Sequence, residues 1–195
     1  FIETEQSLQR INIVYDGIRS GIPILLEGET GTSKTRTAIK AAIKNHQKPI
    51  VFSFSSQTTI EDMIGRMTKD TNSWSGFGFK YGPYTQAFME GDCLILDEIN
   101  LAHETVLQCI EASLDSGKLS LETSSGDKRV ITMHKNFHII ATMNPPAGRF
   151  AQKRSRLTMQ FRSRFRSINF LDIEKEELLE IARGLAQNYQ ISDIS

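Results

Sequence analysis

The segment 28–35 has the residue types needed to bind the phosphates of a nucleotide. It reads Gly-Glu-Thr-Gly-Thr-Ser-Lys-Thr and follows the apolar run 22–26, with Glu27 between them. Backbone N–H groups of such a glycine turn surround phosphate oxygens, and the helix that follows points the positive end of its dipole at the same anion. Lys34 would reach the outer phosphates, and Thr35 would hold Mg²⁺. The candidate binding residues are Gly28, Glu29, Thr30, Gly31, Thr32, Ser33, Lys34, Thr35 and Arg36.

One position departs from the usual pattern of such a loop. The pattern has glycine directly before the lysine, whereas this chain has Ser33. Serine lacks the backbone freedom of glycine, and its side chain could crowd the phosphates or point away from them. An ordinary glycine turn is therefore the alternative interpretation of the segment.

Two carboxylates follow a second apolar run. Residues 93–96 are Cys-Leu-Ile-Leu, and Asp97 and Glu98 come next, which is typical of a buried parallel strand that ends in acidic side chains. Open α/β sheets bind ligands at this carboxyl edge. Asp97 could hold Mg²⁺ through water, and Glu98 could take a proton from an attacking water. The alternative is that both residues only cap the next helix.

A third apolar run ends in an amide. Residues 137–143 are followed by Asn144 and Pro145, so Asn144 is expected at the carboxyl edge of another strand. An uncharged amide there can orient a water molecule beside a γ-phosphate without changing the charge of the site. Asn before Pro also commonly starts a turn, and the two interpretations are compatible.

The order of these features resembles that of the AAA+ ATPases. The phosphate loop (Walker A), the Asp-Glu strand (Walker B), the strand-terminal Asn and the stretch 161–165, Phe-Arg-Ser-Arg-Phe, follow one another as in that family. Shorter segments are similar to the dynein-related subfamily, and the resemblance runs from about Phe1 to Arg166. These segments are Ser56-Gln57-Thr58, Ile64-Gly65-Arg66, Gly82-Pro83, 90–102 and 141–145.

The resemblance implies an activity, cofactors and partners. It implies ATP and Mg²⁺ as cofactors, with ATP hydrolysis driving the remodelling of a protein or ribonucleoprotein complex, a chaperone-like activity found in ribosome biogenesis. Arg164, or as second choice Arg162, would extend into the nucleotide site of a neighbouring module and stabilise charge on the γ-phosphate. The neighbours would form a ring, either within one chain or as copies. Ser53 stands where the subfamily often carries an asparagine that restrains the catalytic glutamate.

Two other functions remain open from the residues. The module could bind nucleotide only as a structural element without hydrolysing it, which Ser33 favours and the intact Asp97, Glu98 and Asn144 oppose. It could also be a related GTPase, because the loop recognises phosphates and not the base.

Composition excludes some classes of protein and limits others. The 195 residues suit one domain with a substantial core. Lys plus Arg equals Asp plus Glu at 23 each, so net charge gives no argument for nucleic acid or membrane binding. Neither a membrane span nor a signal segment is expected, and two cysteines suit a reducing compartment. The four histidines lack the spacing of a zinc site.

These observations predict an intracellular protein. A member of the ribosome-maturation branch of the subfamily would be nuclear or nucleolar. Because the chain begins with Phe1 and stops at Ser195, we expect it to be part of a longer protein.

Alternating helices and strands must position these residues. Apolar periodicity predicts helices over 5–19, 35–45, 59–67, 103–116 and 174–186, and strands over 22–26, 50–54, 93–96 and 137–143. Such alternation implies a parallel sheet with right-handed crossovers. The fold class is α/β, a three-layer P-loop NTPase of AAA+ type with a β-hairpin insertion formed by 119–121 and 130–133. We assign 1–171 to the large nucleotide-binding domain and 172–195 to the start of a small helical lid.

The segment 68–84 is predicted to be a long loop. It carries the aromatic residues Trp74, Phe77, Phe79 and Tyr81, and loops of this length inside a compact domain are usually functional. In the family that the chain resembles, this area faces the central pore or a neighbouring module. The aromatics could instead pack on the domain itself or stack on RNA bases, although direct contact with nucleic acid is not expected from two lysines alone.

Overall fold

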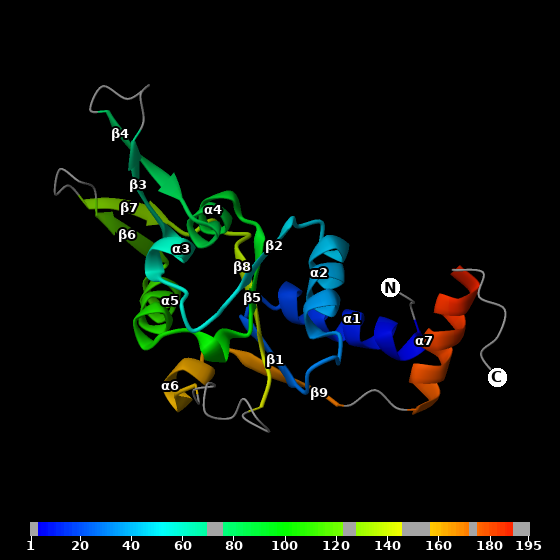
Figure 1. The fold of residues 1–195 in the computed structure, drawn as a ribbon. Helices are drawn as coiled ribbons and strands as arrows, with labels where there is room; N and C mark the ends of the chain where they lie inside the picture. Colours follow the sequence, from blue (N-terminus) through cyan, green and yellow to red (C-terminus); the bar gives the residue numbers. More distant parts are fainter. Residues whose placement is uncertain (1–3, 70–75, 123–127, 146–156, 172–174, 189–195) are drawn as a thin grey trace.

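A five-stranded parallel sheet forms the centre of the molecule (Figure 1). The computed structural model describes residues 4–69, 76–122, 128–145, 157–171 and 175–188. The strands run in the spatial order β2-β5-β8-β1-β9, and every adjacent pair is parallel. Their bounds are β1 Ile24–Gly28, β2 Pro49–Ser53, β5 Cys93–Asp97, β8 His138–Met143 and β9 Arg166–Phe170. The predicted parallel sheet is therefore confirmed, with β9 as a strand that sequence reasoning did not assign.

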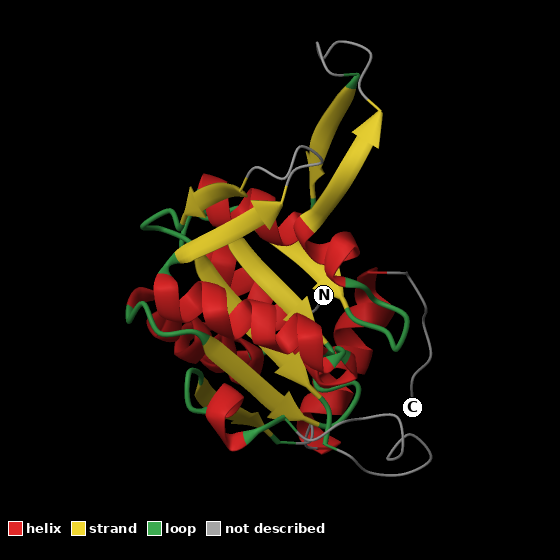
Figure 2. Ribbon diagram, turned by 90° about the vertical axis from the view of Figure 1, so that its left-hand side faces the viewer, coloured by secondary structure: helices red, strands yellow, loops and turns green. Residues whose placement is uncertain are grey.

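Helices cover both faces of the sheet and make three layers (Figure 2). Successive strand residues point to opposite faces, so Ile24 and Leu26 join one apolar cluster with α1 and α2, whereas Leu25 joins a second cluster with α4 and α5. Burial on both faces explains why the strands read as continuous apolar runs. The helices are α1 Glu5–Arg19, α2 Lys34–Lys44, α3 Ile60–Ile64, α4 Pro83–Glu90, α5 Glu104–Ser116, α6 Met159–Arg162 and α7 Lys175–Asn188, with a short 3₁₀ turn, η1, at Ile99–Leu101.

Two β-hairpins project from the same side of this body (Figure 1). One consists of β6 Lys118–Glu122 and β7 Lys128–Thr132, which confirms the predicted insertion. The other consists of β3 Gly65–Lys69 and β4 Phe77–Tyr81. The Arg129 guanidinium, near the turn of the β6–β7 hairpin, lies 5.7 Å from the centre of the Tyr81 ring at the base of the β3–β4 hairpin, so the two hairpins contact each other.

The β3–β4 hairpin corrects two predictions. The helix predicted over 59–67 ends at Ile64, and the loop predicted over 68–84 contains the end of β3, all of β4 and the start of α4. Gly65 causes the early helix end, because its φ of +118° is not helical and is a value that glycine adopts readily. A Cβ at this position would also lie 2.3 Å from the Lys80 carbonyl oxygen. Phe79 and Tyr81 pack against the core, as one alternative held, while Trp74 lies outside the described residues.

Apolar spacing predicts that Leu8 of α1 and four residues of α2, Ala38, Ile39, Ala42 and Ile43, face the core, but Leu8 and Ile43 do not. Leu8 of α1 is 44% exposed and Ile43 of α2 is 54% exposed. The buried face of α2 includes Ala38 and Ala42, as predicted, together with Ala41, and these small residues let the helix approach α1 closely. Ile39, also predicted to face inward, is partly buried and packs against the same apolar cluster.

The C-terminal helix is confirmed as α7, and it contacts α1 through a buried carboxylate. Glu177 is 3% exposed and accepts hydrogen bonds from Thr4 Oγ1 at 2.9 Å and from Arg10 Nη1 at 3.3 Å. The division of the chain at residues 171 and 172 into two domains stays a prediction. None of the described helices has the length and apolar character that a membrane span requires.

Burial shifts the pKa values of two side chains in the sheet, Cys93 and His138. Burial raises the pKa of Cys93 to about 12. Cys93 and Cys109 of α5 are both free thiols. At the first position of β8, His138 is 5% exposed, and its Nε2 atom has no hydrogen-bond partner among the described residues. Burial lowers the pKa of His138 to about 4, so this imidazole is neutral in the folded protein at neutral pH.

His138 should make the protein less stable in mild acid. The unfolded chain takes up the proton near pH 6.5 and the folded chain only near pH 4, so the free energy of unfolding falls as pH drops between these values. Between pH 7.5 and pH 5 the loss from this group is about 2 kcal/mol. Urea denaturation of His138→Phe should lack this part of the pH dependence, whereas the exposed His46→Asn should retain it. An unchanged pH dependence in His138→Phe would contradict the assignment.

Candidate nucleotide-binding site

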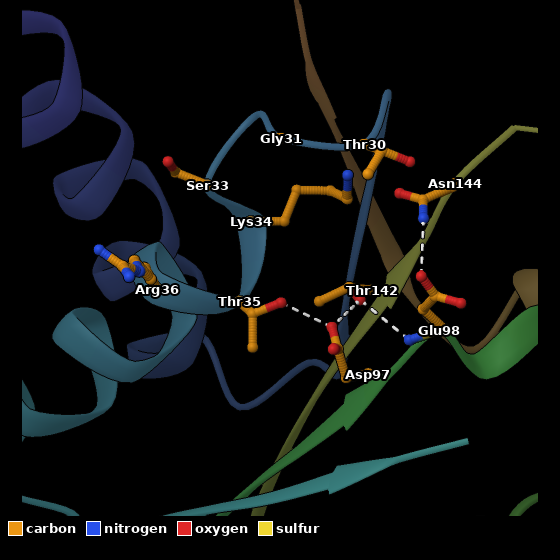
Figure 3. Close-up of a pocket in the computed structure, with 10 residues that line it drawn as sticks. All are labelled: Thr30, Gly31, Ser33, Lys34, Thr35, Arg36, Asp97, Glu98, Thr142 and Asn144. Carbon is orange, nitrogen blue, oxygen red and sulfur yellow. Dashed lines mark hydrogen bonds between the residues drawn. The ribbon is translucent and has the colours of Figure 1, made fainter. Parts of the chain in front are cut away.

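A polar cavity of about 440 Å³ opens at the carboxyl edge of the sheet. It lies where β1, β5 and β8 end and α2 begins, which is the edge at which open α/β sheets bind ligands. The residues that line it come from segments more than a hundred residues apart (Figure 3). They are Thr30, Gly31, Ser33, Lys34, Thr35, Arg36, Asp97, Glu98, Thr142 and Asn144.

The Lys34 ammonium group lies inside the loop that connects β1 to α2. Lys34 is 6% exposed and donates hydrogen bonds to the carbonyl oxygens of Gly28 at 2.8 Å and Glu29 at 2.7 Å, and to Thr32 Oγ1 at 3.2 Å. Gly31 has a φ of +91° with open space around it, so the turn needs glycine for its backbone conformation. A buried cation and the start of a helix thus lie side by side, which suits an anion.

Ser33 lines the cavity, but its side chain points away from the carboxylates. Figure 3 shows its hydroxyl on the side of the loop away from Glu98 and Asn144. The cost of this serine lies in its backbone, which is left-handed with φ 63° and ψ 21°, a conformation that glycine adopts without strain. As N-cap of α2, Ser33 makes no side-chain capping bond, and the first N–H groups of the helix can receive an anion.

Asp97 is bound by hydroxyl groups from two other elements. Its Oδ1 atom accepts one hydrogen bond from Thr35 Oγ1 and one from Thr142 Oγ1, both at 2.6 Å. A carboxylate and a hydroxyl in contact are the type of oxygen ligand set that Mg²⁺ prefers, so the residues present fit this ion. Thr142 was not predicted as a site residue. A signal was present, because it is a polar residue inside an apolar run.

Glu98 lies beside Asn144, and both are at the carboxyl edge of the sheet, where the sequence predicted them. Glu98 Oε1 accepts a hydrogen bond from Asn144 Nδ2 at 3.1 Å, and the Glu98 N–H donates to Thr142 Oγ1 at 3.1 Å. Its φ of 54° ends the strand, and its side chain makes no capping bond to η1. Helix α5 is capped by His103 instead, so the alternative interpretation of 97–98 as helix caps is not supported.

Asn144 is fixed through its backbone. It is 4% exposed, and its carbonyl oxygen accepts a hydrogen bond from Asn100 Nδ2 at 3.0 Å. Asn100 is itself buried in η1 and was not predicted as part of the site. Its contact could not be inferred from sequence, because it depends on how η1 turns back toward β8.

The two candidate arginines do not line this cavity. Arg162 pairs with Glu27 at 2.6 Å. Arg164 pairs with Asp115 at 2.6 Å and Glu111 at 3.0 Å, and its hydrogen bonds lower the pKa of Asp115. Arg164 instead lines a second cavity of about 260 Å³ together with Pro23 and His138, at the beginnings of the strands.

Among the described residues, no three His, Cys, Asp or Glu side chains gather as metal ligands. A Mg²⁺ site of the kind considered above needs one carboxylate beside a hydroxyl, with phosphate and water oxygens supplying the rest. The Thr35 and Asp97 pair meets that requirement.

Comparison with known proteins connects this geometry to a family. The model of the AAA domain of the dynein-related subfamily matches residues 23–165. Midasin of Giardia intestinalis is 30% identical over 97% of the chain, and midasin of Dictyostelium discoideum is 30% identical over 82%. The uncharacterized protein YojN of Bacillus subtilis is 31% identical over 68% of the chain.

The chain spans only a small part of these relatives. It covers 4% and 3% of the two midasins and 44% of YojN. A crystal structure of a candidate ATPase from Cytophaga hutchinsonii superimposes with a TM-score of 0.68 at 22% identity, covering 93% of this chain and 55% of that one. This likeness shows the fold.

The strained backbone of Ser33 gives a prediction about stability. Because φ is 63°, Ser33→Gly should raise the free energy of unfolding by about 1 kcal/mol. Ser33→Ala keeps the strain and should bring no gain, which makes it the matched control in urea denaturation. Since the hydroxyl points away from the carboxylates, both variants should bind Mg-ADP within about threefold of the unmodified chain. A gain in stability from alanine equal to that from glycine would contradict this account.

Proposed function

We propose, because the chain belongs to the dynein-related subfamily of AAA domains, that it binds Mg-ATP and hydrolyses it to drive rearrangement of a protein or ribonucleoprotein complex. One observation carries the proposal: Lys34, the Thr35–Asp97 pair and the Glu98–Asn144 pair face one cavity. These are the groups needed to bind phosphates, hold a cation and activate water.

Binding would begin with the phosphates replacing contacts inside the loop. Lys34 would exchange the carbonyl oxygens of Gly28 and Glu29 for phosphate oxygens, so its ammonium group would donate to anionic acceptors in place of neutral ones. Backbone N–H groups of 30–35 and the start of α2 would contact the same anion. Thr35 and Asp97 would hold Mg²⁺, which supplies positive charge to the phosphates when it is bound.

Hydrolysis would use the pair beside the cation site. Glu98 accepts a proton from a water molecule while the oxygen of that water bonds to the γ-phosphorus. At the same time the bond between the γ-phosphorus and the bridging oxygen breaks, and ADP leaves. Asn144 would orient that water, since its amide already reaches the Glu98 carboxylate. The products are ADP and inorganic phosphate.

Arg164 would act on the site of a neighbouring module and not on its own. Its position at the beginnings of the strands, opposite to the nucleotide cavity, supports this assignment. Arg162 remains the second choice. The pairs with Asp115 and Glu27 would have to open before either arginine reached a neighbour. A ring of such modules, within one chain or as copies, is the arrangement in which this residue has a use.

The cellular process in which the module acts is also part of the proposal. Similarity to two midasins at 30% identity supports a role in remodelling ribonucleoprotein complexes in ribosome biogenesis, and with it a nuclear or nucleolar location. A module that holds nucleotide without hydrolysing it is the second candidate, which the strained Ser33 favours. A GTPase is the third, because the residues that line the cavity would contact the phosphates of a nucleotide and not its base.

Lys34→Ala tests the binding part of the proposal. Loss of the ammonium removes charge-assisted hydrogen bonds to phosphate, so calorimetry should show ATP and ADP affinity, measured with Mg²⁺, falling by about 10- to 100-fold. Lys40→Ala, on the exposed side of the same helix, should bind as the unmodified chain does. Equal affinity of the Lys34 variant would contradict the site. Stronger binding of GTP than of ATP would favour the GTPase.

Glu98→Gln tests the chemical step. The amide keeps the size and the hydrogen bond of Glu98 but cannot accept a proton, so ATP binding should persist while turnover in the assembled ring falls by at least about 100-fold. The exposed Glu104→Gln in α5 is the matched control. Undiminished turnover would exclude the role given to Glu98. Absence of turnover in the unmodified protein together with tight ATP binding would favour the non-hydrolysing module.

A further inference from the structure

Thr142 is a polar residue inside a fully buried strand. All six residues of β8 are buried, and Thr142 is 1% exposed. A valine would fill almost the same space and suit a buried parallel strand. A buried hydroxyl is tolerated where it is hydrogen-bonded, so the partners of Thr142 show what the hydroxyl contributes.

The Thr142 hydroxyl contacts two consecutive residues that have different roles. Its single proton is donated to Asp97 Oδ1 at 2.6 Å, and a lone pair accepts the Glu98 N–H at 3.1 Å (Figure 3). A hydroxyl is one donor and two acceptors, and so this arrangement has a fixed direction. One oxygen atom thereby links the residue proposed to hold Mg²⁺ with the residue proposed to activate water.

The backbone of Glu98 needs such a link. Its φ of 54° and ψ of 46° are left-handed, which is unfavourable for a residue with a Cβ. Conformations of this kind persist where the surroundings fix them. The hydrogen bond from the Glu98 N–H to Thr142 fixes the peptide group at which β5 ends, and with it the direction in which the Glu98 side chain leaves toward Asn144.

Asp97 is oriented by the same hydroxyl. Thr35 and Thr142 both donate to Oδ1, from α2 on one side and from β8 on the other. If one of these donors is removed, the Asp97 carboxylate can rotate about its Cβ–Cγ bond. Thr142 therefore restrains both acidic residues from a position in the sheet.

We propose that Thr142 is a positioning residue for ATP hydrolysis. It holds the carboxylate of Asp97 and the backbone of Glu98 in one fixed arrangement, and it acts on the substrate only through these two residues. The inference rests on the proposed function, because it gives Thr142 a part in that reaction.

The first test needs no nucleotide. Amide hydrogen exchange measured by NMR on the chain reports whether the Glu98 N–H is held by the Thr142 hydroxyl. In Thr142→Val this exchange should be at least about tenfold faster, and in Thr142→Ser it should stay within about threefold of the unmodified chain. Thr85→Val is the matched control, because Thr85 is also fully buried and donates to the Ile64 carbonyl at 2.7 Å. Equal protection in Thr142→Val would overturn the proposal.

The second test separates positioning from a merely structural role. In the protein that carries this chain, Thr142→Val should lower the rate constant of ATP turnover by at least about tenfold while the Kd for Mg-ATP changes by less than about threefold. Thr142→Ser and Thr85→Val should both turn over ATP at near the normal rate. Normal turnover by Thr142→Val in an active protein, or an equal loss in Thr85→Val, would overturn this inference alone. An unmodified protein without ATP turnover would overturn it together with the proposed function.

Discussion

The site depends on the hydrogen bonds that meet at the Asp97 carboxylate. Oδ1 receives the hydroxyls of Thr35 and Thr142, and these three residues come from α2, β5 and β8. An ionised carboxylate at the edge of a buried sheet has to keep its hydrogen bonds, because the loss of water around it is otherwise expensive. The same contacts that satisfy Asp97 therefore hold the start of α2 at the carboxyl edge of the sheet. The position of the phosphate loop follows from that attachment.

Much of this arrangement could be predicted from sequence, for a physical reason. The pair Asp97 and Glu98 and the residue Asn144 each come directly after an apolar run, and the loop 28–35 follows one with Glu27 between them. Strands buried on both faces are continuous apolar runs, and parallel strands end at one edge. A polar residue immediately after such a run is therefore expected at that edge. The order of the strands was not available from this reasoning, yet the meeting of their ends did not depend on it.

The features that were missed depend on contacts between distant segments. The strand β3 begins at Gly65 because its partner β4 approaches closely enough to exclude a Cβ, and local sequence reads the segment as the end of a helix. Asn100 reaches Asn144 only because η1 turns the chain back toward β8. Thr142 could be predicted in part. A hydroxyl in an apolar strand indicates that it has a hydrogen-bond partner, but the partner can be identified only from the pairing of β5 with β8 in the structure.

Lys34, Asp97 and Glu98 each have neutral hydrogen-bond partners that a ligand could replace. Lys34 donates to two carbonyl oxygens and a hydroxyl, Asp97 accepts from two hydroxyls, and Glu98 accepts from an amide. An ammonium group is attracted more strongly by an anionic oxygen than by a neutral carbonyl oxygen, so an anion of high charge can draw Lys34 from its carbonyls. Direct pairing of Lys34 with a buried carboxylate would oppose this step, because breaking a buried ion pair leaves an uncompensated charge. The strained conformations of Ser33 and Glu98 flank the same cavity, and backbone strain of this type is concentrated where a ligand binds. Neutral partners and local strain together make a site that is formed in advance yet can exchange its internal contacts for phosphate.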